Sequence, residues 1–328
     1  MRIIRISSYF LKLVAAIGIA TAYALPASAQ GFPSKPITVI FPFTAGSPVD
    51  TVFRDIAQHA SKTLGQPVLL EARPGANNRL GLAAVKTAKP DGYLLAMAFD
   101  AVLVSQPIID SNFHLEPVRD YAPVQLTLEF PMVMIGGTSP PIKDVKEFVA
   151  YAKANPGKVN FAAVGGGTGH FIAERMRQAM GIDVTMVPYK GSPPAITDLI
   201  GNRVNVLLTG ANARPFINSG KVVGIATTGS QRWSAFPDLP TLTESGIAVA
   251  SSTWYGLVAP PGTPPDVIAK LNSAFNAAMQ VPEIRKNLEE KFGMLPRGNL
   301  TPDEFTSFIR AESRTWAPIL KASGIKIE

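Results

Sequence analysis

The sequence predicts an α/β protein with two domains. Short apolar runs alternate with helical patterns along most of the chain, at a spacing typical of strands followed by crossover helices. Two of these runs each lead through a glycine-containing turn into the start of a helix. Once an N-terminal leader of 29 residues is set aside, 299 of the 328 residues remain, which suits two hydrophobic cores better than one.

The first 29 residues have the layout of a cleavable export signal. Three basic residues and no acidic one precede the end of an apolar stretch over Leu13–Leu25, and Ala27-Ser28-Ala29 is a small-x-small cleavage site. The stretch is too short for a transmembrane anchor, which needs about 20 residues. We therefore expect cleavage after Ala29 and secretion to the periplasm.

Composition excludes several classes of site. There is no cysteine among the 328 residues, so disulfides, thiolate catalysis and cysteine-based metal sites are ruled out. Removing the leader lowers the net charge from +7 to +4, because it takes three of the 31 basic residues and none of the 24 acidic ones. The basic residues form no block, so nucleic-acid binding gains no support.

The first half of the mature chain predicts three strands and two helices. Ile37–Phe41, Val68–Glu71 and Tyr93–Ala98 are short apolar runs typical of strands, and a helix is expected over Leu80–Ala88. Another helix begins at Pro48, where the residues on one helical face are apolar: Val49, Val52, Phe53, Ile56, Ala57 and Ala60.

The second half repeats the scheme. Asp144 with Glu147 resembles a capping box, Gly201 ends a short helix that begins at Ser192, and Thr301-Pro302-Asp303-Glu304 begins the last helix. The alternation predicts mostly parallel sheets. The remaining expected elements are strands at Met132–Ile135, Val159–Val164, Val204–Leu208 and Val222–Ala226, a helix ending at Met180, and a helix with Ile268, Leu271, Phe275 and Met279 on one face.

Two strand–turn–helix loops are candidate ligand sites. One is Thr44-Ala45-Gly46-Ser47-Pro48, after the first strand; the other is Gly165-Gly166-Gly167-Thr168-Gly169-His170, with Thr168 as the expected N-cap. Free backbone N–H groups at a helix N-terminus bind carboxylates or phosphates, and ligands of open α/β sheets lie beyond the carboxyl ends of strands. The alternative is that both are ordinary turns and caps.

The sequence gives little support for a catalytic site or a metal site. The three histidines, His59, His114 and His170, show no metal-ligand spacing, and there is no G-x-S-x-G motif. We expect His59 and His114 at the surface. His170 falls in the first turn of a helix, where the dipole disfavours protonation. No cofactor and no metal are therefore predicted.

Many short motifs together resemble the substrate-binding proteins of tripartite tricarboxylate transporters, also called Bug proteins. They occur in family order over almost the whole mature chain: Phe32-Pro33-Ser34-Lys35-Pro36-Ile37-Thr38, Pro42-Phe43, Arg73-Pro74-Gly75-Ala76, Pro90-Asp91-Gly92-Tyr93, Ala150 to Lys158, Gly167-Thr168 with His170, Pro188-Tyr189-Lys190-Gly191, and Ala259 to Pro265.

The resemblance implies a two-domain periplasmic binding protein of the Venus flytrap, type II-like fold, with the ligand cleft between the domains. We expect residues 30–127 and 250–328 in domain 1 and 128–249 in domain 2. Family members bind small carboxylates and deliver them to a permease of one large and one small membrane subunit. The residues carried over to ligand binding are Phe43, Thr44, Ala45, Gly46, Ser47, Gly166, Gly167, Thr168, His170 and Tyr189, with Asp50 as an organiser of the first loop.

The chain departs from the family pattern near the expected cleft. Ser47 replaces a glycine, and Phe99 and Asp100 stand where glycine and hydroxyl residues are usual. An acid there would repel a second carboxylate and accept a bond from an amine or hydroxyl, and Phe99 could stack on a ring. This favours an amino-bearing or aromatic monocarboxylate. The alternative is that Asp100 points to solvent at a strand end.

Two other functions stay open on the sequence. A stand-alone periplasmic sensor or scavenger would bind the same ligands without a permease. An exported hydrolase or lyase would need a nucleophile and a base in the cleft, where the chain offers one histidine and no cysteine. The expected protein is a monomer that binds a small carboxylate and no nucleic acid.

Overall fold

The computed structural model describes residues 31–43, 48–76, 79–164, 168–189 and 191–323. The chain divides into two compact units, Met1–Ser34 and Lys35–Glu328, and every strand and helix named below belongs to the second. The predicted leader, residues 1–29, lies outside the described residues, so its cleavage stays a prediction.

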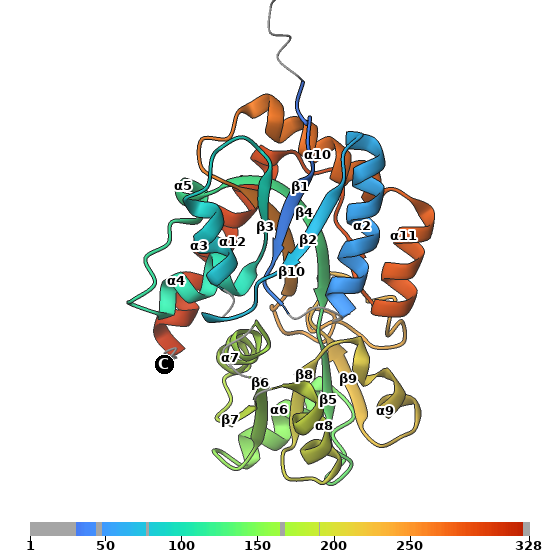
Figure 1. The fold of residues 1–328 in the computed structure, drawn as a ribbon. Coiled ribbons are helices and arrows are strands. Elements are labelled where there is room, and N and C mark those ends of the chain that lie inside the picture. Colours follow the sequence, from blue (N-terminus) through green and yellow to red (C-terminus); the bar gives the residue numbers. More distant parts are fainter. Residues whose placement is uncertain (1–30, 44–47, 77–78, 165–167, 190, 324–328) are drawn as a thin grey trace, which may run out of the picture. The chain divides into compact units, whose positions relative to one another are not determined.

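The strands and helices follow in an alternating order (Figure 1). The strands are β1 (Ile37–Phe41), β2 (Val68–Ala72), β3 (Leu94–Phe99), β4 (Ala122–Pro131), β5 (Val133–Gly136), β6 (Asn160–Val164), β7 (Thr185–Tyr189), β8 (Val206–Thr209), β9 (Val223–Thr227), β10 (Ser252–Ala259) and β11 (Leu295–Pro296). The α-helices are α2 (Pro48–Leu64), α3 (Leu80–Lys86), α4 (Gln106–Ile109), α5 (Pro117–Asp120), α6 (Val145–Ala154), α7 (Thr168–Met180), α8 (Ser192–Ile200), α9 (Arg214–Asn218), α10 (Pro265–Met279), α11 (Pro282–Lys286) and α12 (Pro302–Ser323). The described residues also include two π-helices, η2 (Ala101–Ser105) and η4 (Asn287–Phe292), and a 3-10 helix, η3 (Ala211–Ala213).

The strands form two sheets. Sheet A has the order β11-β4-β10-β3-β1-β2, and sheet B has the order β7-β6-β8-β5-β9. Strand β4 ends at Pro131 and β5 begins at Val133, so the chain passes from one sheet to the other within two residues. The predicted α/β class is confirmed; the predicted domain boundaries at 127/128 and 249/250 stay a prediction.

The expectation of mostly parallel sheets is wrong, because both sheets are mixed. Strand β1 runs parallel to β2 and β3, and β6 runs parallel to β7 and β8. By contrast, β10 is antiparallel to β3 and β4, and β5 is antiparallel to β8 and β9. Antiparallel neighbours need no crossover helix. The central strands β4 and β10 are buried along most of their length, so they lack the alternation that reveals a half-exposed strand.

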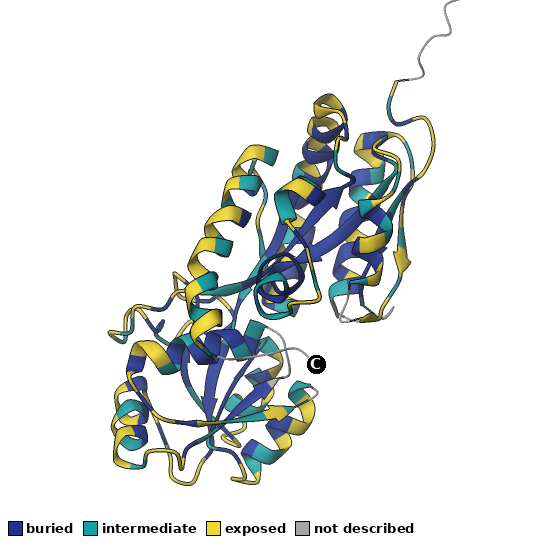
Figure 2. Ribbon diagram, turned by 90° about the vertical axis from the view of Figure 1, so that its left-hand side faces the viewer, coloured by how far each residue is buried: buried dark blue, intermediate teal, exposed yellow. Residues whose placement is uncertain are grey.

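The parallel strands place four connections at the carboxyl edges of the sheets. In sheet A, β1 leads to residues 42–47 and α2, and β3 leads directly to η2. In sheet B, β6 leads to residues 165–167 and α7, and β8 leads to η3. Figure 2 shows the strands mostly buried and the helices exposed along their outer faces.

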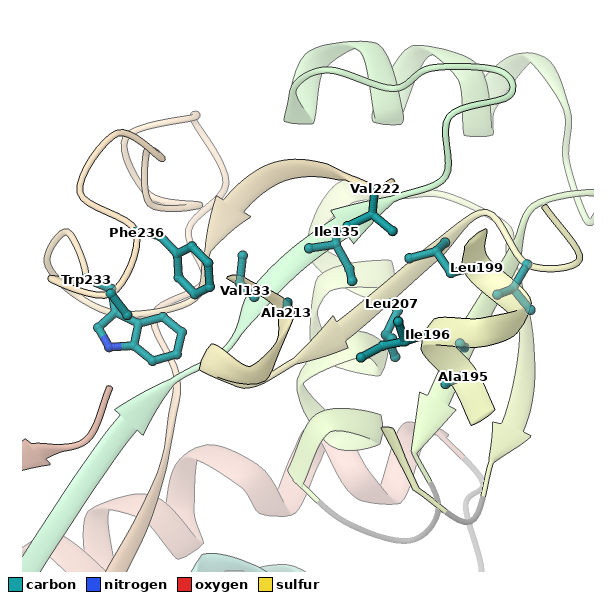
Figure 3. Close-up of a cluster of buried hydrophobic side chains, with 13 residues drawn as sticks. Val133, Ile135, Ala195, Ile196, Leu199, Leu207, Ala213, Val222, Trp233 and Phe236 are labelled. Carbon is teal, nitrogen blue, oxygen red and sulfur yellow. The ribbon is translucent and has the colours of Figure 1, made fainter. Parts of the chain in front are cut away.

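A hydrophobic cluster holds sheet B together (Figure 3). Trp233 and Phe236 lie at one end of it, with their ring centroids 5.1 Å apart in an edge arrangement. The Trp233 Nε1–H donates to the Gly293 carbonyl at 2.8 Å, just after η4. A Cβ at Gly293 would lie 2.8 Å from the Ala211 Cβ, and its φ is +62°, so the close approach requires glycine. Other buried members are Val133, Ile135, Ala162, Ala195, Ile196, Leu199, Val204, Leu207, Ala213, Val222 and Ala235.

Three of the predicted helix ends, at Asp144, Gly201 and Thr301, are confirmed. Asp144 accepts a hydrogen bond from the Glu147 N–H at 2.8 Å. Thr301 and Glu304 form a reciprocal pair: the Glu304 N–H donates to Thr301 Oγ at 3.2 Å, and Glu304 Oε2 accepts from the Thr301 N–H at 2.8 Å. Gly201 follows the last residue of α8. Across the described ranges, no helix is both long enough and apolar enough to span a membrane.

Candidate functional site

The structure describes about half of the predicted ligand-binding residues. Thr44, Ala45, Gly46, Ser47, Gly166 and Gly167 lie outside the described residues, so their backbone N–H groups stay a prediction. The described ones are Phe43, Asp50, Phe99, Asp100, Thr168, His170 and Tyr189. Phe43, Asp50, Thr168 and His170 lie in or beside the two predicted loops. Phe99 contacts Phe43, and Asp100 contacts Thr168.

Asp100 and Thr168 are joined directly. Asp100 follows β3 of sheet A, and Thr168 is the first residue of α7, which follows β6 of sheet B. The Thr168 hydroxyl donates to Asp100 Oδ2 at 2.5 Å. The prediction of Thr168 as the N-cap of this helix is therefore wrong: the residue already belongs to α7, and its hydroxyl is used by Asp100 rather than by the helix N-terminus.

Burial controls the charge of Asp100. Its side chain is 4% exposed, so the alternative that it points to solvent is wrong. Desolvation raises the pKa of Asp100 from 3.8 to about 7, against the hydrogen bond from Thr168, which lowers it. Its second oxygen, Oδ1, is buried and has no hydrogen-bond partner among the described residues. A substantial fraction of Asp100 is therefore protonated at neutral pH.

Four aromatic rings form a cluster that includes Phe99, the residue before Asp100. Phe99 lies 5.2 Å from Phe43 and 5.9 Å from Tyr255 between ring centroids, and Phe130 stacks on Tyr255 at 5.7 Å. Phe99 is 8% exposed, so protein rings cover most of the ring that was expected to stack on a ligand. Burial and the Asp100 carboxylate both raise the pKa of Tyr255, so its hydroxyl stays protonated. Sequence reasoning missed Tyr255 and Phe130 because it missed their strands, β10 and β4.

His170 lies one turn into α7 beside Glu174. Its pKa is lowered, chiefly by burial, while the Glu174 carboxylate acts in the opposite direction. The ring therefore stays neutral at pH 7, in the predicted direction. The largest cause is desolvation, where the sequence pointed to the helix dipole. Glu174 itself is paired with Arg177 at 2.6 Å, nearly one turn further along α7.

Asp50 and Tyr189 have partners within their own segments. Asp50 Oδ2 accepts from Arg54 Nε at 3.0 Å, one turn further along α2, which agrees with a role in organising the start of that helix. The Tyr189 hydroxyl donates to Asp198 Oδ2 at 2.7 Å. Since this hydroxyl already has an acceptor, Tyr189 holds β7 to α8.

A cavity adjoins the aromatic cluster. Its volume is about 560 Å³, and Phe130 belongs to both the cavity wall and the cluster. Val49 in the first turn of α2 also lines it. The rest of the wall comes from residues that follow β8 (Gly210, Ala211, Asn212, Arg214 and Pro215), from the end of η4 (Lys291 and Phe292) and from Met294. In the described part of the chain, no three His, Asp or Glu side chains gather closely enough to hold a metal ion.

Solved structures with the same fold define the class. MatC from Rhodopseudomonas palustris with bound malate is 31% identical and superposes with a TM-score of 0.73 over 88% of this chain and 100% of that one. Another R. palustris protein, solved with adipate, is 26% identical with a TM-score of 0.76 over 90% and 99% of the two chains. BugD, a periplasmic binding protein, is 31% identical with a TM-score of 0.73 over 90% and 100%. The fold is that of a two-domain periplasmic solute-binding protein.

Sequence comparison identifies the family. The model of the tripartite tricarboxylate transporter family receptor matches residues 52–325. BugT of Bordetella pertussis is 33% identical over 326 residues, which cover 97% of this chain and 99% of that protein. A Cupriavidus necator protein named "UPF0065 protein in gbd 5'region" is 36% identical over 285 residues, covering 86% and 85%. The chain belongs to the tripartite tricarboxylate transporter receptor family, and the predicted resemblance is confirmed.

Proposed function

We propose that this receptor captures a small carboxylate in the periplasm and presents it to a tripartite tricarboxylate-type permease of one large and one small membrane subunit. The observation that carries the ligand class is that two structures of the same fold were solved with dicarboxylates, malate and adipate. The family description supports the transport role. BugD, which shares the fold, is a periplasmic binding protein, which agrees with a function other than catalysis.

The proposed mechanism uses the two loops that the sequence singled out. The loops of residues 43–47 and 166–170 follow the carboxyl ends of β1 and β6 and lead into α2 and α7. The backbone N–H groups at the start of a helix carry partial positive charge, so a carboxylate placed there is stabilised without a cation. Capture between two such loops favours a closed arrangement of the two domains.

The Asp100–Thr168 hydrogen bond supports this arrangement. It connects the end of β3 in sheet A to the first turn of α7 in sheet B, next to the proposed carboxylate loop. We infer that Asp100 is a positioning residue that fixes the start of α7. The idea that Asp100 selects an amino-bearing or aromatic monocarboxylate is a separate proposal, which calorimetry of the wild type and Asp100→Ala with citrate and with amino acids tests. Tight citrate binding that the substitution leaves unchanged would contradict it.

A thermal-shift experiment tests the proposed function. The mature chain, residues 30–328, is heated with malate, adipate, citrate, glutamate or benzoate, and adipamide serves as the uncharged counterpart of adipate. A ligand that binds only the folded state at 100 times its Kd adds about 2.7 kcal/mol to the free energy of unfolding. For a chain of this size that raises the Tm by roughly 5 °C.

The comparison between the carboxylates and the uncharged adipamide decides whether the proposed function holds. A rise in Tm with at least one carboxylate and none with adipamide supports capture of a carboxylate. If no carboxylate of the panel changes the Tm, or if adipamide changes it as much as adipate does, the proposed function is wrong. Co-purification with the two membrane subunits tests transport, and a receptor that binds carboxylates but no permease would act as a stand-alone sensor.

A further inference from the structure

The cavity beside the aromatic cluster has the size of a ligand site. Its volume of about 560 Å³ falls within the range of roughly 300 to 1,000 Å³ that small-molecule sites occupy. Four segments contribute to its wall: the first turn of α2, the end of β4, the connection from β8 to α9, and η4 with Met294. The cavity is therefore built by segments far apart in the sequence.

The charged groups in its wall are both cations. Arg214 and Lys291 line the cavity together with Asn212, and no acidic side chain is among the described residues that line it. Neither cation forms an ion pair with another described residue within 4.0 Å. The Nε of Arg214 is buried and has no hydrogen-bond acceptor in the described part of the chain. An anion that supplied an acceptor would remove the cost of this unsatisfied group.

The rest of the wall is largely apolar. Phe130 and Phe292 present aromatic rings, and Val49, Pro215 and Met294 add aliphatic surface. A ligand that fills the cavity thus needs an apolar body as well as an anionic group. A compact, fully polar anion would leave this surface without a partner.

The cavity wall includes residues that lie close in the chain or in sheet B to the elements flanking the proposed carboxylate loops. Val49 is the second residue of α2, directly after the loop that follows β1. Residues 210–212 follow β8, which is parallel to β6 and ends at the same edge of sheet B. Val49 and residues 210–212 are thus the basis for placing the far end of a loop-bound ligand in this cavity.

We propose that the cavity is a second anion subsite in which Lys291 and Arg214 receive the distal acid group of a dicarboxylate with an apolar body. This inference rests on the proposed function, since the loops hold the first carboxylate. Arg214 also borders a neighbouring cavity of about 340 Å³ that Asp238 lines. Both cations line the larger cavity, but of the two cavities Lys291 lines only that one, so we assign Lys291 as the primary contact and Arg214 as the supporting one.

Matched pairs of ligands and variants test the subsite. Calorimetry measures the ratio of the Kd for hexanoate to the Kd for adipate, two six-carbon acids that differ only in the second carboxylate. In the wild type we expect a preference for adipate of at least tenfold. Lys291→Gln and Arg214→Gln should each reduce the ratio about three- to tenfold, the usual effect of one charge-assisted contact at a partly exposed site. Arg214→Lys should retain most of the preference.

Lys221→Gln is the matched control, because it removes an exposed positive charge beside α9 outside the cavity wall. The Tm without ligand checks that each variant is folded. If the wild type binds adipate and hexanoate equally, or if Lys291→Gln and Arg214→Gln keep the full preference, the subsite is wrong and carboxylate capture stands. If Lys221→Gln lowers the ratio as much as Lys291→Gln, the effect is general electrostatics and the subsite is also wrong. If neither acid binds, carboxylate capture fails with it.

Discussion

Asp100→Asn should stabilise the protein at neutral and alkaline pH. The asparagine keeps the shape of the side chain and an oxygen that accepts from Thr168, but it cannot ionise. In the wild type, burial raises the pKa of Asp100 from 3.8 to about 7, so the folded state disfavours the charged form. A difference of this size corresponds to roughly 4 kcal/mol between the two ionisation states.

The sign of the pH dependence follows from proton release. Below pH 3.8 Asp100 is protonated in the folded and in the unfolded state, so ionisation costs no stability. Between pH 3.8 and about 7 the unfolded chain loses this proton while the folded chain keeps it, so folding becomes less favourable as the pH rises. Above pH 7 the whole penalty is present. The ionised side chain is hydrated whenever the contact with α7 opens, which reduces the cost of its charge. Roughly 4 kcal/mol is therefore the upper bound on the stability that ionisation of Asp100 costs.

Urea denaturation from pH 4 to pH 9 measures the effect. The free energy of unfolding of Asp100→Asn minus that of the wild type should be small at pH 4 and should rise with pH to reach about 2–4 kcal/mol at pH 8. Asp198→Asn is the control: Tyr189 and Arg203 lower the pKa of Asp198, so this substitution should destabilise the protein by an amount that stays nearly constant above about pH 5. A difference between Asp100→Asn and the wild type that is constant over this range, or that falls with pH, would refute the account of Asp100.

Three further substitutions test contacts around the site and the core. Thr168→Val removes the hydroxyl that lowers the pKa of Asp100, so that pKa should rise further, as NMR titration measures, and stability should fall by about 1 kcal/mol at pH 4. Gly256→Ala places a Cβ against the Phe305 ring and within 2.9 Å of a backbone oxygen, so the Tm should fall by several degrees, and an unchanged Tm would contradict the packing of β10. Asn272→Ala removes a buried amide that donates to the Val124 carbonyl at 2.8 Å and leaves buried acceptors unsatisfied; urea unfolding should show a loss of about 2–3 kcal/mol, whereas a loss below 0.5 kcal/mol would contradict this role.

The sequence predicts strand–turn–helix units better than it predicts the buried strands β4 and β10. Strands β1 and β6 and helices α2 and α7 are foreseen because glycine-rich turns and one-sided apolar stripes mark them. Strands β4 and β10 are missed because burial on both faces removes their alternation. The antiparallel pairings that they make are missed with them.

The same limit applies to the site. The sequence singles out Asp100 and Phe99 as cleft residues, which stays a prediction, but it does not show their partners, which lie on other elements: Thr168 in α7, and Tyr255 in the unpredicted β10. Lys291 lies in a π-helix whose apolar pattern differs from that of an ordinary helix. Local spacing cannot show that Lys291 lines the same cavity as Val49 of α2, which lies more than 200 residues earlier in the sequence.

The interleaved order of the strands also determines when each sheet can be completed as the chain emerges from its N-terminus. All strands of sheet B lie between residues 133 and 227, whereas sheet A combines residues 37–131 with β10 and β11 after residue 252. Strand β10 lies between β3 and β4, so sheet A is split into two separate pieces until that strand arrives. A chain that emerges from its N-terminus can thus complete sheet B before sheet A. Until β10 is available, β3 has no hydrogen-bonded neighbour on the side that faces β10 in the complete sheet. A chain that stops before residue 252 would retain a full set of sheet B strands and lack the strand that closes sheet A.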